Sequence, residues 1–142
     1  MEQEFEARRS AQRRLVVRRD LRAADLRRAD LSRADLTAAD LAHARLSRAN
    51  MQYANLEGAD LSKAHLTYAI VSNTQLSSAN LEGASLIGAN MYLAKMEHAR
   101  LKLARLNKAF LRGADLTGSD LTQIKATQAS FREAKLDHAR LA

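Results

Sequence analysis

The stretch that decides the fold is residues 24–43, which read ADLRRADLSRADLTAADLAH. A unit of five residues occurs here four times in succession, and in each unit an apolar residue that we term the centre follows Ala by two positions. The four centres are Leu26, Leu31, Leu36 and Leu41. Because an internal repeat constrains the architecture more strongly than the propensity of any single residue, it is the first feature to interpret.

The same unit continues on both sides of this stretch. A centre falls at every fifth residue from Leu21 to Leu141, which makes twenty-five units, and nineteen of the centres are Leu. The remaining centres are Met51, Val71, Met91, Met96, Ala126 and Phe131. Ala precedes the centre by two residues in all units but four, which have Arg19, Thr74, Ser119 or Ile124 instead. The variation is therefore concentrated at the other three positions of the unit.

The period of five excludes both a helix and a long strand. Ala, Leu, Arg and Lys are good helix formers, but at about 100° per residue a step of five turns the centre by about 140° around a helix. The centres would then wind around the cylinder and form no apolar stripe. In a strand, successive centres would point to opposite faces. A short extended piece followed by a corner fits instead, because residues two apart share one face and the centre and its Ala then both point inward.

The glycines support a corner at a fixed place in the unit. All five lie two residues after a centre, at Gly58, Gly83, Gly88, Gly113 and Gly118. A position that repeatedly takes Gly is one where the backbone adopts a positive φ or a tight turn. The absence of Pro agrees, since each unit would donate its N–H groups to a neighbouring coil.

The repeated triplets identify a family. ADL occurs at residues 24–26, 29–31, 34–36, 39–41, 59–61 and 114–116, and ANL or ANM at 49–51, 54–56, 79–81 and 89–91. This pattern resembles the pentapeptide-repeat family, with the signature A(D/N)LXX, over roughly residues 19–142. The resemblance implies an all-β fold, a right-handed quadrilateral β-helix with four units per coil, and here about six coils. At a strand spacing of about 4.8 Å per coil, the rod would be roughly 30 Å long.

The ends and one internal stretch depart from the repeat. Residues 1–18 carry no clear unit, and we expect them to form an N-terminal cap, with Val16 as a degenerate first centre and a short helix as one possible form. Residues 19–142 form the β-helical domain. The repeat runs in register to Leu141 with no capping segment. We therefore expect the last coil to contact another subunit, as a homodimer or end to end, or to continue in a longer protein. At Leu121–Ala126, where Ile and Ala exchange places, we expect a local bulge or kink.

Composition narrows the functional classes. The chain of 142 residues has no Cys, which excludes disulfides, cysteine-ligated metals and a thiol nucleophile. No apolar run is long enough to span a membrane, and the N-terminus lacks the pattern of a secretory signal, so we expect a cytoplasmic protein. Hydrophobic residues make up 46% of the chain but aromatic residues only 4%, so the core must be built from Ala and Leu.

Four units per coil sort the outward residues onto four faces, two of which are candidate binding surfaces. The net charge of +7 is gathered on the expected cap and on the basic face, which surrounds the centres from Leu26 to Ala126 and carries Arg27, Arg28, Arg45, Arg48, Arg105, Lys108 and Lys125 against the single acid Asp25. The apolar face, around the centres from Leu31 to Phe131, carries Tyr53, Ile70, Tyr92, Leu93 and Phe110. The first could bind phosphates or an acidic protein, or be merely solvated, and the second could bind a partner or be ordinary surface.

Catalysis finds no support in the sequence. The histidines are distributed over three faces as His43, His65, His98 and His138, and only the last two share a column, about 10 Å apart, which is too far to share one metal. The recurring Asp residues before the centres are typical of side chains that bond the backbone of a turn. Neither a phosphate-binding glycine loop nor a nucleophile with its base is present. We expect no enzyme activity, no cofactor and no metal.

Three functional hypotheses follow. The first is a rigid, non-catalytic scaffold that presents its basic and apolar faces to a macromolecular partner. The second comes from the resemblance, because one branch of the family mimics DNA, binds gyrase and protects it from quinolones. That branch is strongly acidic with a C-terminal dimer interface, whereas this chain is net positive and shows no C-terminal dimer helix. The third is electrostatic binding of nucleic acid or an anionic membrane through the basic face.

Overall fold

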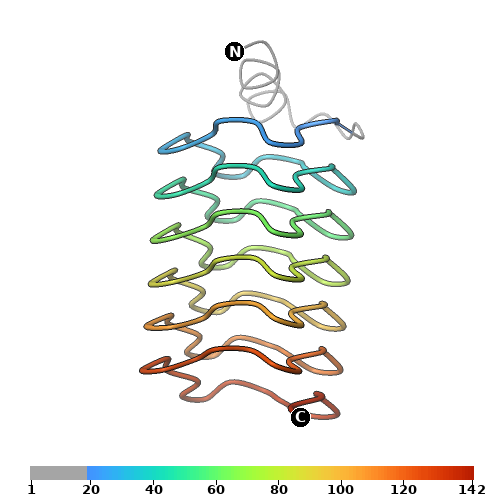
Figure 1. The fold of residues 1–142 in the computed structure, drawn as a ribbon, viewed down its shortest axis with the longest axis vertical. Helices are drawn as coiled ribbons and strands as arrows, with labels where there is room; N and C mark the ends of the chain where they lie inside the picture. The colour runs from blue at the N-terminus through green and yellow to red at the C-terminus, as the bar shows by residue number, and fades with distance from the viewer. Residues whose placement is uncertain (1–18) are drawn as a thin grey trace.

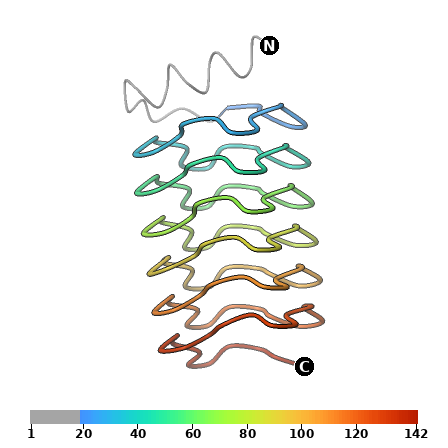
Figure 2. The ribbon, with the colours of Figure 1, turned by 90° about the vertical axis from the view of Figure 1, so that its left-hand side faces the viewer.

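Residues 19–142, the part of the chain that the structure describes, form a stack of four-sided coils in the computed structural model (Figures 1 and 2). Each unit makes one parallel β-bridge to the residue twenty positions later, from Asp20 with Asp40 to Asp120 with Arg140. Twenty residues per coil are four units of five, which confirms the four-sided coil that the resemblance implied. Within 19–142 the structure has no helix, and every strand is a single bridging residue.

The N-terminal segment and the handedness of the coil remain predictions. The predicted cap at 1–18, with Val16 as a degenerate centre, lies outside the described residues. The right-handed sense of winding remains a prediction that rests on the resemblance.

The backbone of one unit shows why five residues suffice. The N–H of the centre Leu21 donates to the carbonyl of Asp40 in the next coil at 2.7 Å, and the N–H of Ala23 donates to Ala42 at 2.9 Å. The N–H of Ala24 then turns back to the carbonyl of Leu21 at 3.1 Å. Ala23 has a φ of 55°, so residues 21–24 form a type II turn, with its positive φ at the third position. In a regular unit three of the five N–H groups thus bond to an adjacent coil, and the other two bond within the turns of their own coil.

The corner two residues after each centre has a positive φ throughout residues 19–142. Nineteen non-glycine residues and all five glycines lie there, with φ between 54° and 69°. The predicted position of the corner is therefore confirmed, but positive φ alone does not explain why some corners carry Gly. At Gly88 the ring of Tyr68 lies so close that an added Cβ would be 2.4 Å from its Cε1. Some glycines thus make room for the side chain of the preceding coil.

The core consists of stacked centres and their Ala partners, as the sequence predicted. Centres from Leu21 to Leu121 are at most 1% exposed, and the Ala residues between them are buried. Burying one Leu side chain contributes about 1.5–3 kcal/mol, so the ladder of centres dominates the stability of the rod. Ala at the second inward position keeps the interior narrow, which is why few aromatic residues fit.

Two turns deviate from the regular pattern. Within residues 19–142, neither Thr74 nor Ile124 donates its N–H to the centre three residues earlier. Thr74 stands where most units have Ala, and its hydroxyl donates to the carbonyl of Met51 at 2.8 Å. Of the bulge or kink expected at 121–126, the bulge is wrong, because Lys125 keeps its bridge to Arg105 and the register is unchanged. Only the turn is disturbed there.

The last coil, residues 122–142, is less buried than those before it. Its centres Phe131 and Leu136 are half-buried, and Leu141 is 62% exposed. A centre in the middle of the stack is covered by a neighbouring coil on each side. This difference follows from the nearest-neighbour packing of a solenoid, in which a coil is covered only by the adjacent coils.

Candidate binding faces

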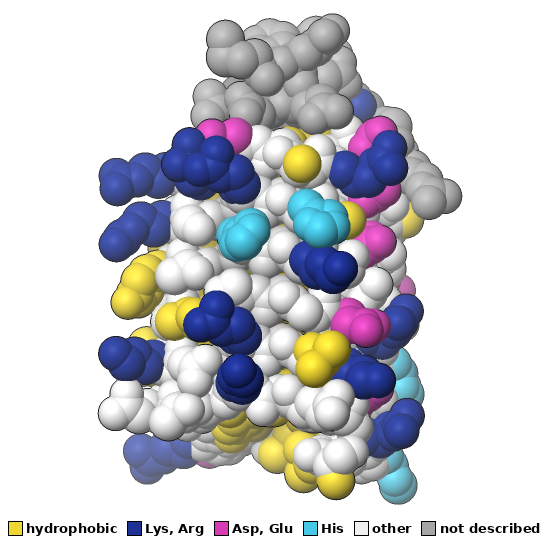
Figure 3. All heavy atoms as spheres, viewed as in Figure 1, with side chains coloured by type: hydrophobic (Ala, Val, Ile, Leu, Met, Phe, Trp, Pro, Cys, Tyr) yellow, Lys and Arg dark blue, Asp and Glu magenta, His cyan; other side chains and the backbone are white. Residues whose placement is uncertain are grey.

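The basic face is one flat side of the rod, at the left of Figure 3. The bridges place Asp25, Arg45, His65, Ser85, Arg105 and Lys125 in one column along the stack. The cations of this face form two groups, which we term the upper basic cluster (Arg28, Arg45 and Arg48) and the lower basic cluster (Arg105, Lys108 and Lys125). All six side chains are exposed. The structure therefore places these predicted residues on a common surface, in two clusters with neutral residues between them.

Asp25 is engaged with its own arginine. The Nη2 of Arg27 lies 2.6 Å from Oδ2 of Asp25, and the Nε donates to Oδ1 at 2.8 Å. These bonds hold the pKa of Asp25 well below its ordinary value. Arg45 lies farther away, with its Nη1 3.6 Å from the same carboxylate. The one acid of the basic face thus mainly offsets the charge of Arg27, and it lies four coils away from Arg105 of the lower basic cluster.

The apolar face forms a patch across three successive coils. Ile70 and Phe110 lie in one column with Asn90 between them, as their bridges show. Tyr92 and Leu93 belong to the coil of Asn90, so they lie between the other two side chains along the axis. Phe110 is 58% exposed and Ile70 is 37% exposed. Four of the five predicted residues therefore come together in the middle of the rod.

Polar groups border this patch at both ends. Toward the N-terminus the guanidinium of Arg33 lies 4.9 Å from the ring centre of Tyr53, the fifth predicted residue of the face. Toward the C-terminus Arg112 donates to Glu133 at 3.1 Å. An apolar centre with a polar rim is the usual anatomy of a protein interface.

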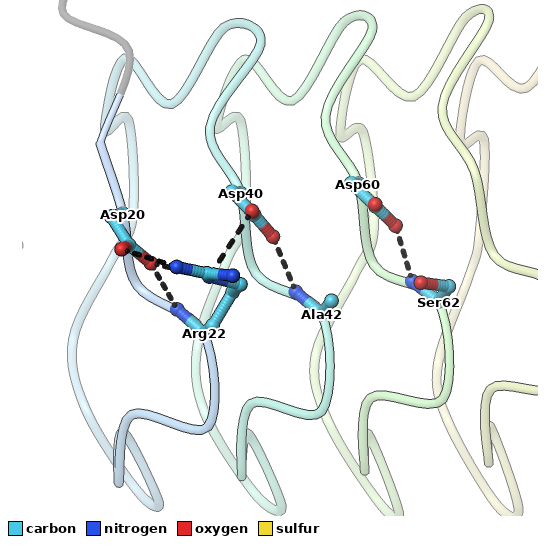
Figure 4. A network of polar contacts seen from close by, with 6 residues as sticks. All are labelled: Asp20, Arg22, Asp40, Ala42, Asp60 and Ser62. Atoms are coloured by element: carbon cyan, nitrogen blue, oxygen red, sulfur yellow. Dashed lines mark hydrogen bonds and ion pairs between the residues drawn. The ribbon is translucent and has the colours of Figure 1, made fainter.

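The aspartates before the centres serve the backbone, as predicted. Figure 4 shows Asp20, Asp40 and Asp60 in successive coils, each turned toward the N–H group two residues later. Hydrogen bonds from the Arg22 side chain, and then from its N–H, lower the pKa of Asp20 from 3.8 to about 2. These carboxylates accept bonds within their own turns, so they are engaged in the fold.

Sequence reasoning did not single out two exposed apolar corners. Tyr68 and Leu103 are each 50% exposed at corners; the corner of Tyr68, two residues before Ile70, joins the basic face to the apolar face, whereas Leu103 lies on a corner that does not border the apolar face. The guanidinium of Arg48 lies 5.2 Å from the ring centre of Tyr68, so this ring is partly covered by a cation. Every corner side chain is displayed outward, which is the signal that could have identified both residues.

Other kinds of site were sought among residues 19–142. These residues include no group of three or more His, Asp or Glu side chains that could hold a metal ion. An open hollow of about 260 Å³ lies beside Tyr53, bordered by Arg33, Ala34, Asp35 and Asn55. No helix long and apolar enough to cross a membrane occurs in the described part of the chain.

Comparison with protein families gives one match. The profile of pentapeptide repeats matches eight copies, over residues 20–52, 44–83, 74–113, 84–123 and 109–142. These segments together cover most of the chain. No curated protein matches the sequence.

Solved structures with a similar fold are also pentapeptide-repeat proteins. Rfr23 from the cyanobacterium Cyanothece 51142 is 39% identical, with a TM-score of 0.48 over 69% of this chain and 60% of that one. The protein alr5209 from Nostoc PCC 7120 is 26% identical, with a TM-score of 0.56 over 58% of this chain and 84% of that one. QnrB1, a plasmid-mediated fluoroquinolone resistance protein, is 23% identical, with a TM-score of 0.52 over 89% and 64% of the two chains. The chain thus spans about three-fifths of the length of Rfr23.

Proposed function

Because the chain belongs to the pentapeptide-repeat family, we propose that it is a non-catalytic scaffold whose apolar face binds a partner protein. Members of this family are generally binding or structural proteins rather than enzymes. In a stack of this kind the backbone and the inward side chains are committed to the fold, so function falls to the outward positions. The four faces are the surfaces on which a partner can be recognised.

The observation that carries the proposal is the apolar patch and its polar border. Tyr92 is 44% exposed and Leu93 is 42% exposed, between Ile70 and Phe110. Single exposed apolar side chains are common, but a contiguous group on a small protein is typical of an interaction site. Aromatic residues at the centre of such a patch contribute most of the binding free energy in known interfaces.

A rigid rod suits this role. The patch residues are anchored by a backbone whose N–H groups bond to the next coil along the stack, as Met91 does to Phe110 at 2.7 Å. A partner therefore meets side chains whose backbone positions are already fixed. Less conformational entropy is lost on binding to such a surface than to a loop.

The alternative of a gyrase-binding DNA mimic has little support in the charge distribution. The column that begins with Asp20, Asp40 and Asp60 continues with Asn80 and Arg100. A continuous line of carboxylates, which could imitate a phosphate backbone, is thus interrupted on this side of the rod. The likeness to QnrB1 concerns the fold alone.

Quantitative partner capture with matched variants tests the proposal. The patch variant carries Tyr92→Ser and Phe110→Ser, and the control carries Leu103→Ser, which removes an exposed apolar side chain from a corner outside the apolar face. We expect one or more proteins captured by the wild type and the control to be lost with the patch variant. Loss of a central aromatic contact costs about 2 kcal/mol or more, a factor of about thirty in affinity.

The result that contradicts the proposal is an unchanged set of captured proteins with the patch variant. Circular dichroism and thermal unfolding of all three proteins show whether the rod is intact. Sedimentation of the purified chain identifies the case in which the partner is a second copy.

A further inference from the structure

We propose that the basic face is a second binding surface, which contacts the phosphate backbone of duplex nucleic acid without reading its sequence. This surface lies on a different side of the rod from the apolar face. The inference therefore stands or falls independently of the proposed protein partner.

The two basic clusters have a separation suited to a groove of a duplex. Three coils separate Arg45 from Arg105 in the bridging column. At about 4.8 Å per coil, this places the clusters about 14 Å apart. The major groove of B-DNA is about 12 Å wide, so the clusters can contact phosphates on its two edges while the flat face lies across it.

The side chains between the clusters are neutral or hydrogen-bonding groups. His65 and Ser85 occupy the column between Arg45 and Arg105. The hydroxyl of Thr67 lies 3.3 Å from that of Ser85 beside this column. Such groups can donate to phosphate oxygens, and no carboxylate lies in this column between the two clusters to repel them.

The lower basic cluster is not neutralised by the protein. Among the residues that the structure describes, no ion pair involves Arg105, Lys108 or Lys125. Several cations of other faces are paired with acids, as Arg100 is with Glu82 at 2.9 Å and Lys135 with Asp115 at 3.8 Å. Cations without acidic partners on a chain of net charge +7 attract polyanions over a distance and release counterions on binding.

The composition of the face favours nucleic acid over an acidic protein. Protein interfaces are depleted of charge and enriched in aromatics at their centres, whereas nucleic-acid interfaces are more polar and strongly positive. The centre of the basic face carries His65 and Ser85, and its aromatic residue, Tyr68, stands at a corner with its ring partly covered by Arg48. Single-strand binders stack successive bases on several aromatic rings, and this face has one, so it suits a duplex backbone better than a single strand.

Fluorescence anisotropy with the full chain and a labelled duplex of about 20 base pairs, between about 50 mM and 200 mM salt, tests this inference. If all six cations of the two clusters contact phosphates, the slope of log K against log salt is about −5, and affinity falls about a thousandfold over this range. Duplexes of different sequence should bind alike.

Matched variants locate the contact. The cluster variant carries Arg105→Ser, Lys108→Ser and Lys125→Ser, and we expect it to reduce the magnitude of the slope by about 2.7. The control carries Lys95→Ser, Arg112→Ser and Lys135→Ser, which remove the same charge from other faces and should leave the slope nearly unchanged. If the cluster variant fails to fold, Lys108→Ser alone should reduce the slope by about 0.9.

Three outcomes overturn the inference. The first is the absence of duplex binding at the lowest salt concentration, and the second is an equal loss of slope in the cluster and control variants. The third is tighter binding of the basic face to a polyglutamate peptide or to phosphatidylserine vesicles than to the duplex. That result would assign the face to an acidic protein or to a membrane surface.

Discussion

Two glycine corners with nearly the same backbone provide a sharp test of how neighbouring coils pack. Gly58 has a φ of +67° and Gly88 a φ of +66°, so Gly58→Ala and Gly88→Ala impose the same backbone strain. A Cβ at position 58 meets no atom within 4 Å. A Cβ at position 88 would lie 2.4 Å from Cε1 of Tyr68 and 2.5 Å from its Cδ1. Any difference between the two variants therefore reports the contact with the ring.

The expected magnitudes follow from these distances. A left-handed backbone costs Ala about 1–2 kcal/mol, and the reduced entropy of the unfolded chain returns about 0.4–1 kcal/mol, so Gly58→Ala should destabilise by about 1 kcal/mol. Gly88→Ala must also displace the ring of Tyr68. The displaced ring loses its packing on the corner and its contact with Arg48, worth about 0.5–1 kcal/mol at an exposed site. We expect an extra cost of about 1 kcal/mol in total.

Urea denaturation of five proteins measures this coupling: the wild type, both single glycine variants, Tyr68→Ala, and Tyr68→Ala combined with Gly88→Ala. In the double variant the extra cost at position 88 should disappear, because Ala at 68 leaves room for the new Cβ. Equal destabilisation by Gly58→Ala and Gly88→Ala would refute the reasoning. So would a double variant whose free energy of unfolding is the simple sum of the two changes.

The remaining predictions concern the core, one irregular turn and the acidic side chains. Leu66→Ala removes the side chain of a fully buried centre and should lower the free energy of unfolding by about 2–5 kcal/mol, as measured by urea denaturation. Leu136→Ala, in the half-buried last coil, should lower it clearly less, and equal losses would contradict the nearest-neighbour account. Ser72→Ala removes a buried hydroxyl with no partner among residues 19–142, and should leave the free energy of unfolding unchanged or raise it by up to about 1 kcal/mol. Hydrogen bonds from Thr117 and Thr122 lower the pKa values of Asp115 and Asp120 below the ordinary value of 3.8. The two carboxylates therefore stabilise the fold at pH values above 3.8, and this contribution is lost as the pH falls through the lowered pKa values. The thermal midpoint should fall across that acid range, and less so in Asp115→Asn; identical pH profiles would contradict this assignment.

The sequence could predict the inward and outward positions of each unit because the period of five is so regular. Leu26 and Ala24 are buried as the alternation required, and the glycines marked the corner correctly. The number of units per coil did not follow from the period, since any polygon can be built from five-residue sides. It came from the resemblance, and the bridges between residues twenty apart now establish it.

Contacts between coils were harder to anticipate. The reason for Gly88 lies in Tyr68, twenty residues earlier, and a local reading of backbone preference could not reveal it. The pairing of Arg27 with Asp25 depends on side-chain geometry rather than on charge alone. The contiguity of the apolar patch could be predicted once four units per coil were assumed, because position in the sequence then fixes the face and the coil. Its role as a binding surface is a matter for experiment.

Site-specific photo-crosslinking tests the central claim, that the apolar face binds a protein partner, most directly. A photoreactive phenylalanine analogue replaces Phe110 in one sample and Leu103 in another, so that the probe lies on the apolar face or on a corner that does not border it. The account predicts covalent adducts with a partner protein from position 110 and none with that protein from position 103. Equal adducts from both positions, or adducts from position 103 alone, would contradict it.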